Sequence, residues 1–310
     1  MFLNRVSDFL MIFLGLLVES LPFVVLGVFI SSLIAVFVKP EFILKFKSKN
    51  VIISHIQSMF IGILLPVCEC GNIPLAKRLI LIGFKPSEVI TFMLAAPILN
   101  PLVLISTLEA FNIDKNIAFI RIISGGLIAL LVGLIFSFNN KELSANSTLV
   151  AKPSFSFSSP VNQVSNVSNP AINFVHINFF ENFRNEFFSV FKVLALGCVL
   201  ASSFQIFIPR DWISLFATEP LLSVLSMIFL AFLISICSSV DAFFALSLSS
   251  TFNLGSIMGF LVFGPMIDIK TLFMLRTIYK PLTLMRLVVL VMLLCTLLGL
   301  GVNYFYKNYY

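Results

Sequence analysis

The chain is dominated by apolar stretches of the length that a membrane-spanning helix needs, which is about 20 residues. Of its 310 residues, 59% are hydrophobic and only 11% are charged, and the mean hydropathy is +1.07. Water-soluble domains of this size do not have such a composition. We therefore predict an all-α polytopic membrane protein embedded in the lipid bilayer.

Apolar spans recur along the whole chain and predict about 8 to 10 membrane segments. They cover residues 10–38, 51–66, 73–84, 89–108, 117–138, 187–208, 221–236, 240–252, 255–275 and 282–304. The first is expected to be a retained helix, because it lacks the basic start and cleavage site of a signal peptide. So little chain lies outside the spans that a nucleic-acid-binding module or an anchored soluble enzyme is excluded, and no cofactor is predicted.

A polar stretch rich in Ser, Asn and Pro divides the chain into two halves. It shows no apolar period and is typical of a flexible linker. We predict a first transmembrane repeat over residues 1–138, a polar cytoplasmic linker over 139–186 and a second transmembrane repeat over 187–310.

The two halves share landmarks in the same order, which indicates an internal duplication. The offsets lie between 168 and 170 residues for three matches: Leu26-Gly27 with Leu196-Gly197, Cys68 and Asn72 with Cys237 and Asp241, and Pro97 to Asn100 with Pro265 to Asp268. Three landmarks with so little drift are difficult to obtain by chance.

Loop charge favours two copies of opposite orientation. If the loop with Lys39, Lys45, Lys47 and Lys49 is cytoplasmic, then 15 of the 20 basic residues, Lys270 among them, lie inside, as the positive-inside rule expects. Arg121 then lies near the outer face, and so does the loop 209–220, which is poor in positive charge. Inverted repeats with interrupted helices are typical of secondary transporters, whose site lies near the midplane.

Helix breaks in the two halves carry cysteines. The segment Pro66 to Pro74 has two prolines and a glycine around Cys68 and Cys70, and Cys237 begins the equivalent break of the second half. Three sulfurs from facing breaks suit a thiophilic species such as trivalent arsenic, Cu(I) or Hg(II). The alternative is that these cysteines are small apolar core residues.

Acids and amides accompany the cysteines within apolar segments, where a carboxylate is costly and tends to face a cavity or a partner. Glu69, Asp241 and Asp268 are candidate proton-coupling groups, and Asn72 and Asn100 are the neutral counterparts of the two aspartates. The alternative is that each polar side chain caps the end of a broken helix.

Taken together, these motifs resemble the predicted permeases of the organoarsenical exporter (ArsP-type) family. The resemblance covers nearly the whole chain except the linker and rests on Pro66–Pro74, Phe92–Pro101, Cys237–Asp241 and Phe263–Lys270. It implies a bacterial inner-membrane permease, and some relatives export trivalent methylated or aromatic arsenicals. The chain departs from the family pattern at Ser239 and Val240, where relatives often have Glu-Ala.

We therefore predict a multi-pass secondary permease, and not an enzyme, that exports a thiophilic small solute bound by Cys68, Cys70, Cys237, Asn72 and Asn100. The chain has no phosphate-binding loop for a nucleotide, so energy would come from a proton gradient or a partner. One alternative is a permease for a non-thiophilic solute or ion. Another is a membrane-embedded thiol oxidoreductase or metallochaperone that uses Cys68 and Cys70. A homo-oligomer is compatible with either.

Overall fold

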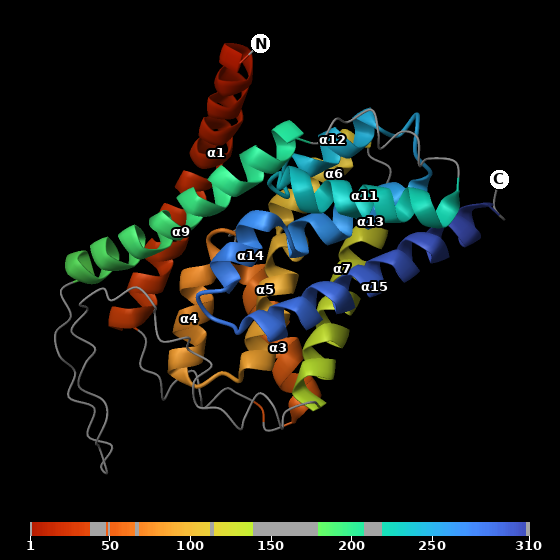
Figure 1. Ribbon diagram of the computed structural model, residues 1–310. Coiled ribbons are helices and arrows are strands. Elements are labelled where there is room, and N and C mark those ends of the chain that lie inside the picture. Colours follow the sequence, from red (N-terminus) through yellow and green to blue (C-terminus); the bar gives the residue numbers. More distant parts are fainter. Residues whose placement is uncertain are drawn as a thin grey trace.

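The computed structural model describes residues 2–37, 48, 50–65, 68–111, 115–138, 179–207 and 219–307. Within these ranges the chain is all helical and has no strand (Figure 1). The helices are α1 (Phe2–Phe37), α3 (Val51–Leu64), α4 (Asn72–Ile82), α5 (Pro86–Leu99), α6 (Pro101–Ala110), α7 (Lys115–Phe138), α9 (Phe179–Phe207), α11 (Pro220–Ile234), α12 (Asp241–Ser247), α13 (Leu254–Met266), α14 (Ile269–Leu275) and α15 (Pro281–Lys307).

Six helical stretches of the described chain are long and apolar enough to cross a membrane: Ser7–Ile34, Pro86–Ala110, Asn116–Phe138, Phe183–Gln205, Leu254–Leu275 and Pro281–Phe305. The shorter apolar helices α3 and α11 accompany them. The all-α polytopic fold expected from the sequence is confirmed, and the molecule is a multi-pass membrane protein.

Helices α5 and α13 form the centre of the molecule. In the most apolar part of each span, 83% of the residues around α13 and 67% of those around α5 are buried, against 17% in α1. The two central helices contact each other. Large apolar side chains of α1 and α15, such as Met11 and Leu297, are exposed instead, as lipid-facing residues would be. The centre of the bundle is therefore where polar groups are kept from lipid.

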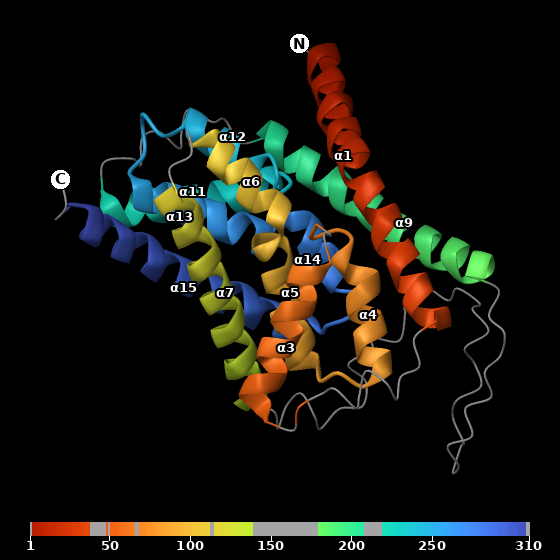
Figure 2. The same ribbon diagram turned by 180° about the vertical axis from the view of Figure 1, so that it is seen from behind.

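Corresponding helices of the two halves pack in the same way. Helix α5 lies between α3 and α7, and α13 lies between α11 and α15 (Figures 1 and 2). The first helices of the halves, α1 and α9, cross each other at one side of the molecule. This shared packing supports a duplication, and the inverted orientation of the copies stays a prediction.

The long spans of both halves are interrupted near their polar residues. The sequence predicts apolar spans over 89–108 and 255–275, in which Pro97 and Pro265 either free carbonyls for a polar pathway or hinge, or simply kink the helix. In the structure both prolines lie inside helices, and the chain leaves the helical conformation at Asn100 and at Ile267, after which α6 and α14 begin. Each half thus has two helix breaks, one at the cysteines and one after the proline.

Two predicted boundaries differ from the structure. Helix α12 ends at Ser247, so the predicted span 240–252 is helical in only its first part. Helix α9 begins at Phe179, inside the predicted linker 139–186, because apolar residues such as Phe183 and Phe187 already pack against the core there. The rest of the linker, residues 139–178, lies outside the described residues, and so does the lysine-bearing loop apart from Ser48.

Close backbone contact holds α1 against the first cysteine-bearing break. Gly27 of α1 faces Gly71, and a Cβ atom added at Gly27 would overlap the Gly71 carbonyl oxygen and Cα atom. Because the obstacle is backbone, it cannot move aside as the end of a flexible side chain can. A glycine at this position is what brings α1 next to the break.

We predict that Gly27→Leu destabilises the protein by about 1–3 kcal/mol or more, as overpacking of a tight contact does. The measurement is the midpoint temperature of unfolding in detergent, followed by fluorescence-detected size exclusion. Gly15→Leu in the same helix is the matched control, because a Cβ atom there meets no described atom within 4 Å. Equal midpoints for the two variants would contradict the contact.

Candidate functional site

The two cysteine-bearing breaks meet in the interior of the protein. The break between α3 and α4 supplies Cys68 and Glu69, and the break between α11 and α12 supplies Cys237. The two sulfur atoms and a Glu69 carboxylate oxygen all lie within 4.8 Å of one another. All three residues are at most 4% exposed. The structure thus brings together ligand atoms from the two halves that the sequence analysis expected to face each other.

Similar turns form the two breaks. The Gly71 amide donates a hydrogen bond to the Cys68 carbonyl at 3.1 Å, and the Val240 amide donates to the Cys237 carbonyl at 3.0 Å. Ser235 ends α11 in the left-handed conformation, with φ of 52°, so the chain turns before it reaches Cys237. These turns direct both cysteines into the space between the halves instead of along a helix face.

The remaining predicted cysteine, Cys70, is buried and lies within interaction range of Cys68. All five cysteines are free thiols. Cys295 lies within α15, and Cys198 lies within α9 but in electrostatic range of Cys70, Lys270 and Asp268. Cys68, Cys70 and Cys237 are the sulfurs of the two breaks, and Cys198 adjoins them from α9.

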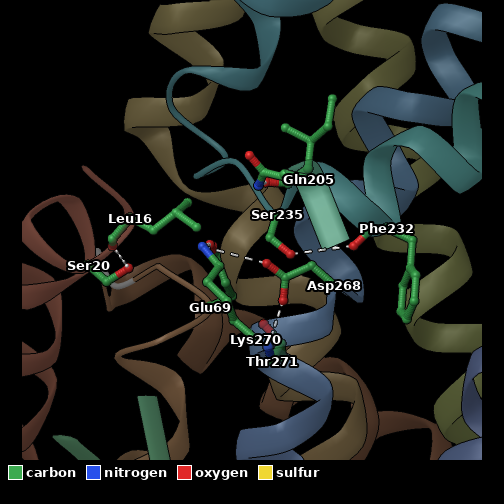
Figure 3. A network of polar contacts seen from close by, with 10 residues as sticks. Leu16, Ser20, Glu69, Gln205, Phe232, Ser235, Asp268, Lys270 and Thr271 are labelled. Atoms are coloured by element: carbon green, nitrogen blue, oxygen red, sulfur yellow. Dashed lines mark hydrogen bonds and ion pairs between the residues drawn. The ribbon is translucent and has the colours of Figure 1, made fainter. Parts of the chain in front are cut away.

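A buried lysine adjoins the cysteines. The Lys270 ammonium nitrogen lies 3.9 Å from a Glu69 oxygen and 3.6 Å from an Asp268 oxygen, and each of these three side chains is at most 3% exposed. Figure 3 shows Glu69, Asp268 and Lys270 converging from the two halves below Ser235. The electrostatics of the site thus involve two carboxylates and one ammonium group.

Asn100 and Asp268 occupy equivalent positions and cap the helices that follow them. The Leu102 amide donates to the Asn100 side chain at 3.1 Å, and the Thr271 amide donates to Asp268 at 2.6 Å. Such caps satisfy backbone groups that the interruption would leave unpaired. This agrees with the capping alternative for these two residues, while Asp268 also keeps its second oxygen toward Lys270.

Asp241 points to a different partner. Its carboxylate pairs with Arg121 of α7 at 2.5 Å, and Arg121 also donates to the Thr107 hydroxyl of α6 at 2.7 Å. Arg121 is only 1% exposed. The ion pair therefore ties the second cysteine-bearing break to two helices of the first half.

Two polar residues of the first break have unused hydrogen-bonding capacity. The side-chain oxygen and nitrogen of Asn72 and both carboxylate oxygens of Glu69 are buried and lack a hydrogen-bond partner among the described residues. Buried polar atoms are normally paired, so such atoms call for an explanation. A ligand that uses them would supply one.

A small apolar cavity adjoins Glu69 and reaches between α5, α13 and α15. Apart from Glu69 and Thr271 its lining is hydrophobic, with two methionine side chains from the central helices. The lining residues are Glu69, Ile90, Met93, Leu94, Met266, Thr271, Leu275, Tyr279 and Leu287. A solute with an apolar substituent would find matching surroundings here.

Sequence reasoning did not place the two cations in the interior. It counted Lys270 among the cytoplasmic charges, with an interfacial ion pair to Asp268 as an alternative, and placed Arg121 near the outer face. The structure contains the Lys270–Asp268 pair, but both cations are buried, and both also approach acids of the other half. A signal was available, because both residues stand within apolar runs. An intramembrane charge is costly unless it is paired, so their positions indicate function or interior ion pairs.

Comparison with known proteins identifies the family. Residues 5–304 match the model of a family described as predicted permease, ArsP_1. The chain belongs to this permease family. It is 37% identical to UPF0718 protein YcgR of Bacillus subtilis (strain 168) over 278 residues. This alignment covers 87% of the chain and 88% of that protein.

A second relative covers even more of the permease. The chain is 30% identical over 304 residues to a putative two-component membrane permease complex subunit of Streptococcus mutans serotype c (strain ATCC 700610 / UA159), with 96% of each protein covered. No solved structure matches the permease. Family and fold together make it a membrane permease of the bacterial plasma membrane.

We predict that Arg121→Gln and Asp241→Asn each destabilise the permease by about 3–5 kcal/mol, because either change leaves a buried charge unpaired. The double variant Arg121→Gln/Asp241→Asn removes both charges and should recover most of the loss. Unfolding midpoints in detergent for the wild type, both single variants and the double variant measure the coupling. Additive losses would show that the two side chains do not act as a pair.

Proposed function

We propose that the permease is a secondary transporter that exports a thiophilic small solute, such as a trivalent organoarsenical, and binds it between the two cysteine-bearing breaks. The observation that carries the proposal is the convergence of two sulfurs and a carboxylate oxygen from opposite halves within 4.8 Å. Thiolates prefer soft ions, whereas hard cations prefer sets of oxygen ligands.

Binding of a trivalent arsenical to this pair of thiols is chemically balanced. A methylarsenic(III) species with two hydroxyl groups forms two As–S bonds, and each hydroxyl group leaves as water with a thiol proton. Arsenic stays trivalent, so no oxidant or reductant is needed. The small apolar cavity beside Glu69 would receive the methyl group.

The other predicted residues support this site in different ways. Cys70 would be a third thiol ligand, and the unpaired side-chain amide of Asn72 would donate a hydrogen bond to the solute. Glu69 lies nearest to the sulfurs and is the favoured proton-linked group. Asn100 would bind the solute and Asp268 would carry a proton, each in addition to capping a helix. Asp241 could carry a proton only after its carboxylate is released from Arg121.

The two alternative functions make different demands. A thiol oxidoreductase needs exposed, reactive thiols, but Cys68, Cys70 and Cys237 are all buried. A permease for a non-thiophilic solute needs no convergence of thiols. Energy for transport would come from a proton gradient. The name of the streptococcal relative, a complex subunit, makes a second protein a candidate partner besides the predicted homo-oligomer.

We predict that Cys68→Ser and Cys237→Ser each abolish the methylarsenite resistance that the permease confers on arsenic-sensitive cells. Serine keeps the side-chain size but removes the soft ligand. The measurement is growth against methylarsenite at matched membrane expression. Cys295→Ser is the control, because this buried cysteine lies within α15 away from the breaks.

Unchanged resistance in either break variant would reject the thiol site. If transport of another solute persisted in both variants, the function would be that of a non-thiophilic permease. Labelling by a membrane-impermeant maleimide would favour the oxidoreductase instead, since it requires accessible thiols.

A further inference from the structure

Lys270 is held in a fixed position beside the cysteine-bearing breaks. It is the second residue of α14, directly after the Asp268 cap, and it is 1% exposed. Gly197 of α9 packs against its backbone, since a Cβ atom added at Gly197 would lie 3.2 Å from the Lys270 Cα atom. The ammonium group therefore stays near the site and cannot leave for solvent without moving α14.

The ammonium group is shared between two acids of different origin. Glu69 belongs to the first half and contributes to the cluster with Cys68 and Cys237, whereas Asp268 belongs to the second half. Charge-assisted hydrogen bonds are about 2.7–2.9 Å long, and both Lys270 distances, 3.9 and 3.6 Å, are longer. Lys270 is therefore shared between the two carboxylates without being bound tightly by either.

Formal charge in this cluster is not balanced. Two carboxylates and one ammonium group leave one negative charge, and each of the three side chains is at most 3% exposed. A buried unpaired charge is unfavourable, so a cation that reaches Glu69 is attracted. The same cation is repelled by Lys270, which already occupies that position electrostatically.

We infer that Lys270 is a tethered counter-cation that competes with soft, thiophilic cations for Glu69. The inference rests on the proposed function and deepens it, because it adds such cations to the uncharged arsenicals that the same thiols would bind. When such a cation binds Cys68, Cys237 and Glu69, Lys270 moves to Asp268, its nearer partner. When the cation leaves, Lys270 returns to Glu69 and neutralises the empty site.

The test is binding of Cd²⁺, a soft divalent cation, to the purified full-length permease in detergent. Ultraviolet absorption of the cadmium–thiolate bond reports binding at sulfur. The variants are Lys270→Gln, which removes the competing charge, and Lys270→Arg, which keeps it. Lys280→Gln is the matched control, since it removes a lysine charge outside the cluster.

We expect Lys270→Gln to bind Cd²⁺ at least tenfold more tightly than the wild type. The expected tightening is large because one charge at this distance is worth a large factor in a partly screened site. Lys270→Arg keeps this charge and Lys280→Gln removes one outside the cluster, so both should stay within about threefold of the wild type. If Lys270→Gln does not fold, the double variant Lys270→Gln/Asp268→Asn is compared with Asp268→Asn alone, and it should bind Cd²⁺ more tightly because only the Lys270 charge differs between them. Equal affinity of the charge-removing variant and the wild type would overturn the inference.

A separate outcome would test the proposed function. Cys68→Ser and Cys237→Ser should abolish the cadmium–thiolate absorption. If they leave it intact, the thiol site itself is wrong. If they abolish it while Lys270→Gln fails to tighten binding, the thiol site stands and the role of Lys270 falls.

Discussion

Pairing of buried opposite charges across the two halves is the constraint on which the rest of the structure depends. Arg121 of the first half pairs with Asp241 of the second, and Lys270 of the second half lies beside Glu69 of the first. The pairing is reciprocal, since one cation of each half lies beside one acid of the other half. Within a membrane protein an unpaired buried charge is strongly unfavourable. The halves are therefore held in register, and this register places Cys68 opposite Cys237.

Helix interruptions create the room for this arrangement, and capping makes the interruptions tolerable. Regular helices satisfy every backbone group inside a bilayer, so a break needs local partners. Asn100 and Asp268 provide them as caps, while Gly27 allows α1 to approach the first break. Asp268 serves two purposes, because one oxygen caps α14 and the other faces Lys270. The same residue thus joins backbone stability to the electrostatics of the site.

Much of this architecture could be predicted from the sequence. Apolar length established the polytopic fold, and two prolines and a glycine located the break at Cys68, because these features are local. The correspondence of the two halves located the break at Cys237. The positions of Arg121 and Lys270 could not be found by counting loop charges, since the positive-inside rule treats a basic residue by its place along the chain. Asp241 and Glu69, their partners in the other half, stand far away in sequence, and only packing brings them together. The prolines alone did not indicate that the helices are interrupted at Asn100 and just before Asp268. These interruptions depend on the side-chain caps of the helices that follow.

A site built from both halves has a consequence for transport. Under the proposed function, a solute bound by Cys68 and Cys237 would bridge the halves, so its bonds would strengthen the contact that must open when access alternates. Tight thiol binding alone would therefore trap the carrier in its loaded state. Groups that replace the solute at its own ligands remove this difficulty: protons can return to the sulfurs, and Lys270 can return to Glu69, which it already approaches at 3.9 Å. Release would then exchange one set of buried partners for another, and Glu69 would not be left without a counter-charge.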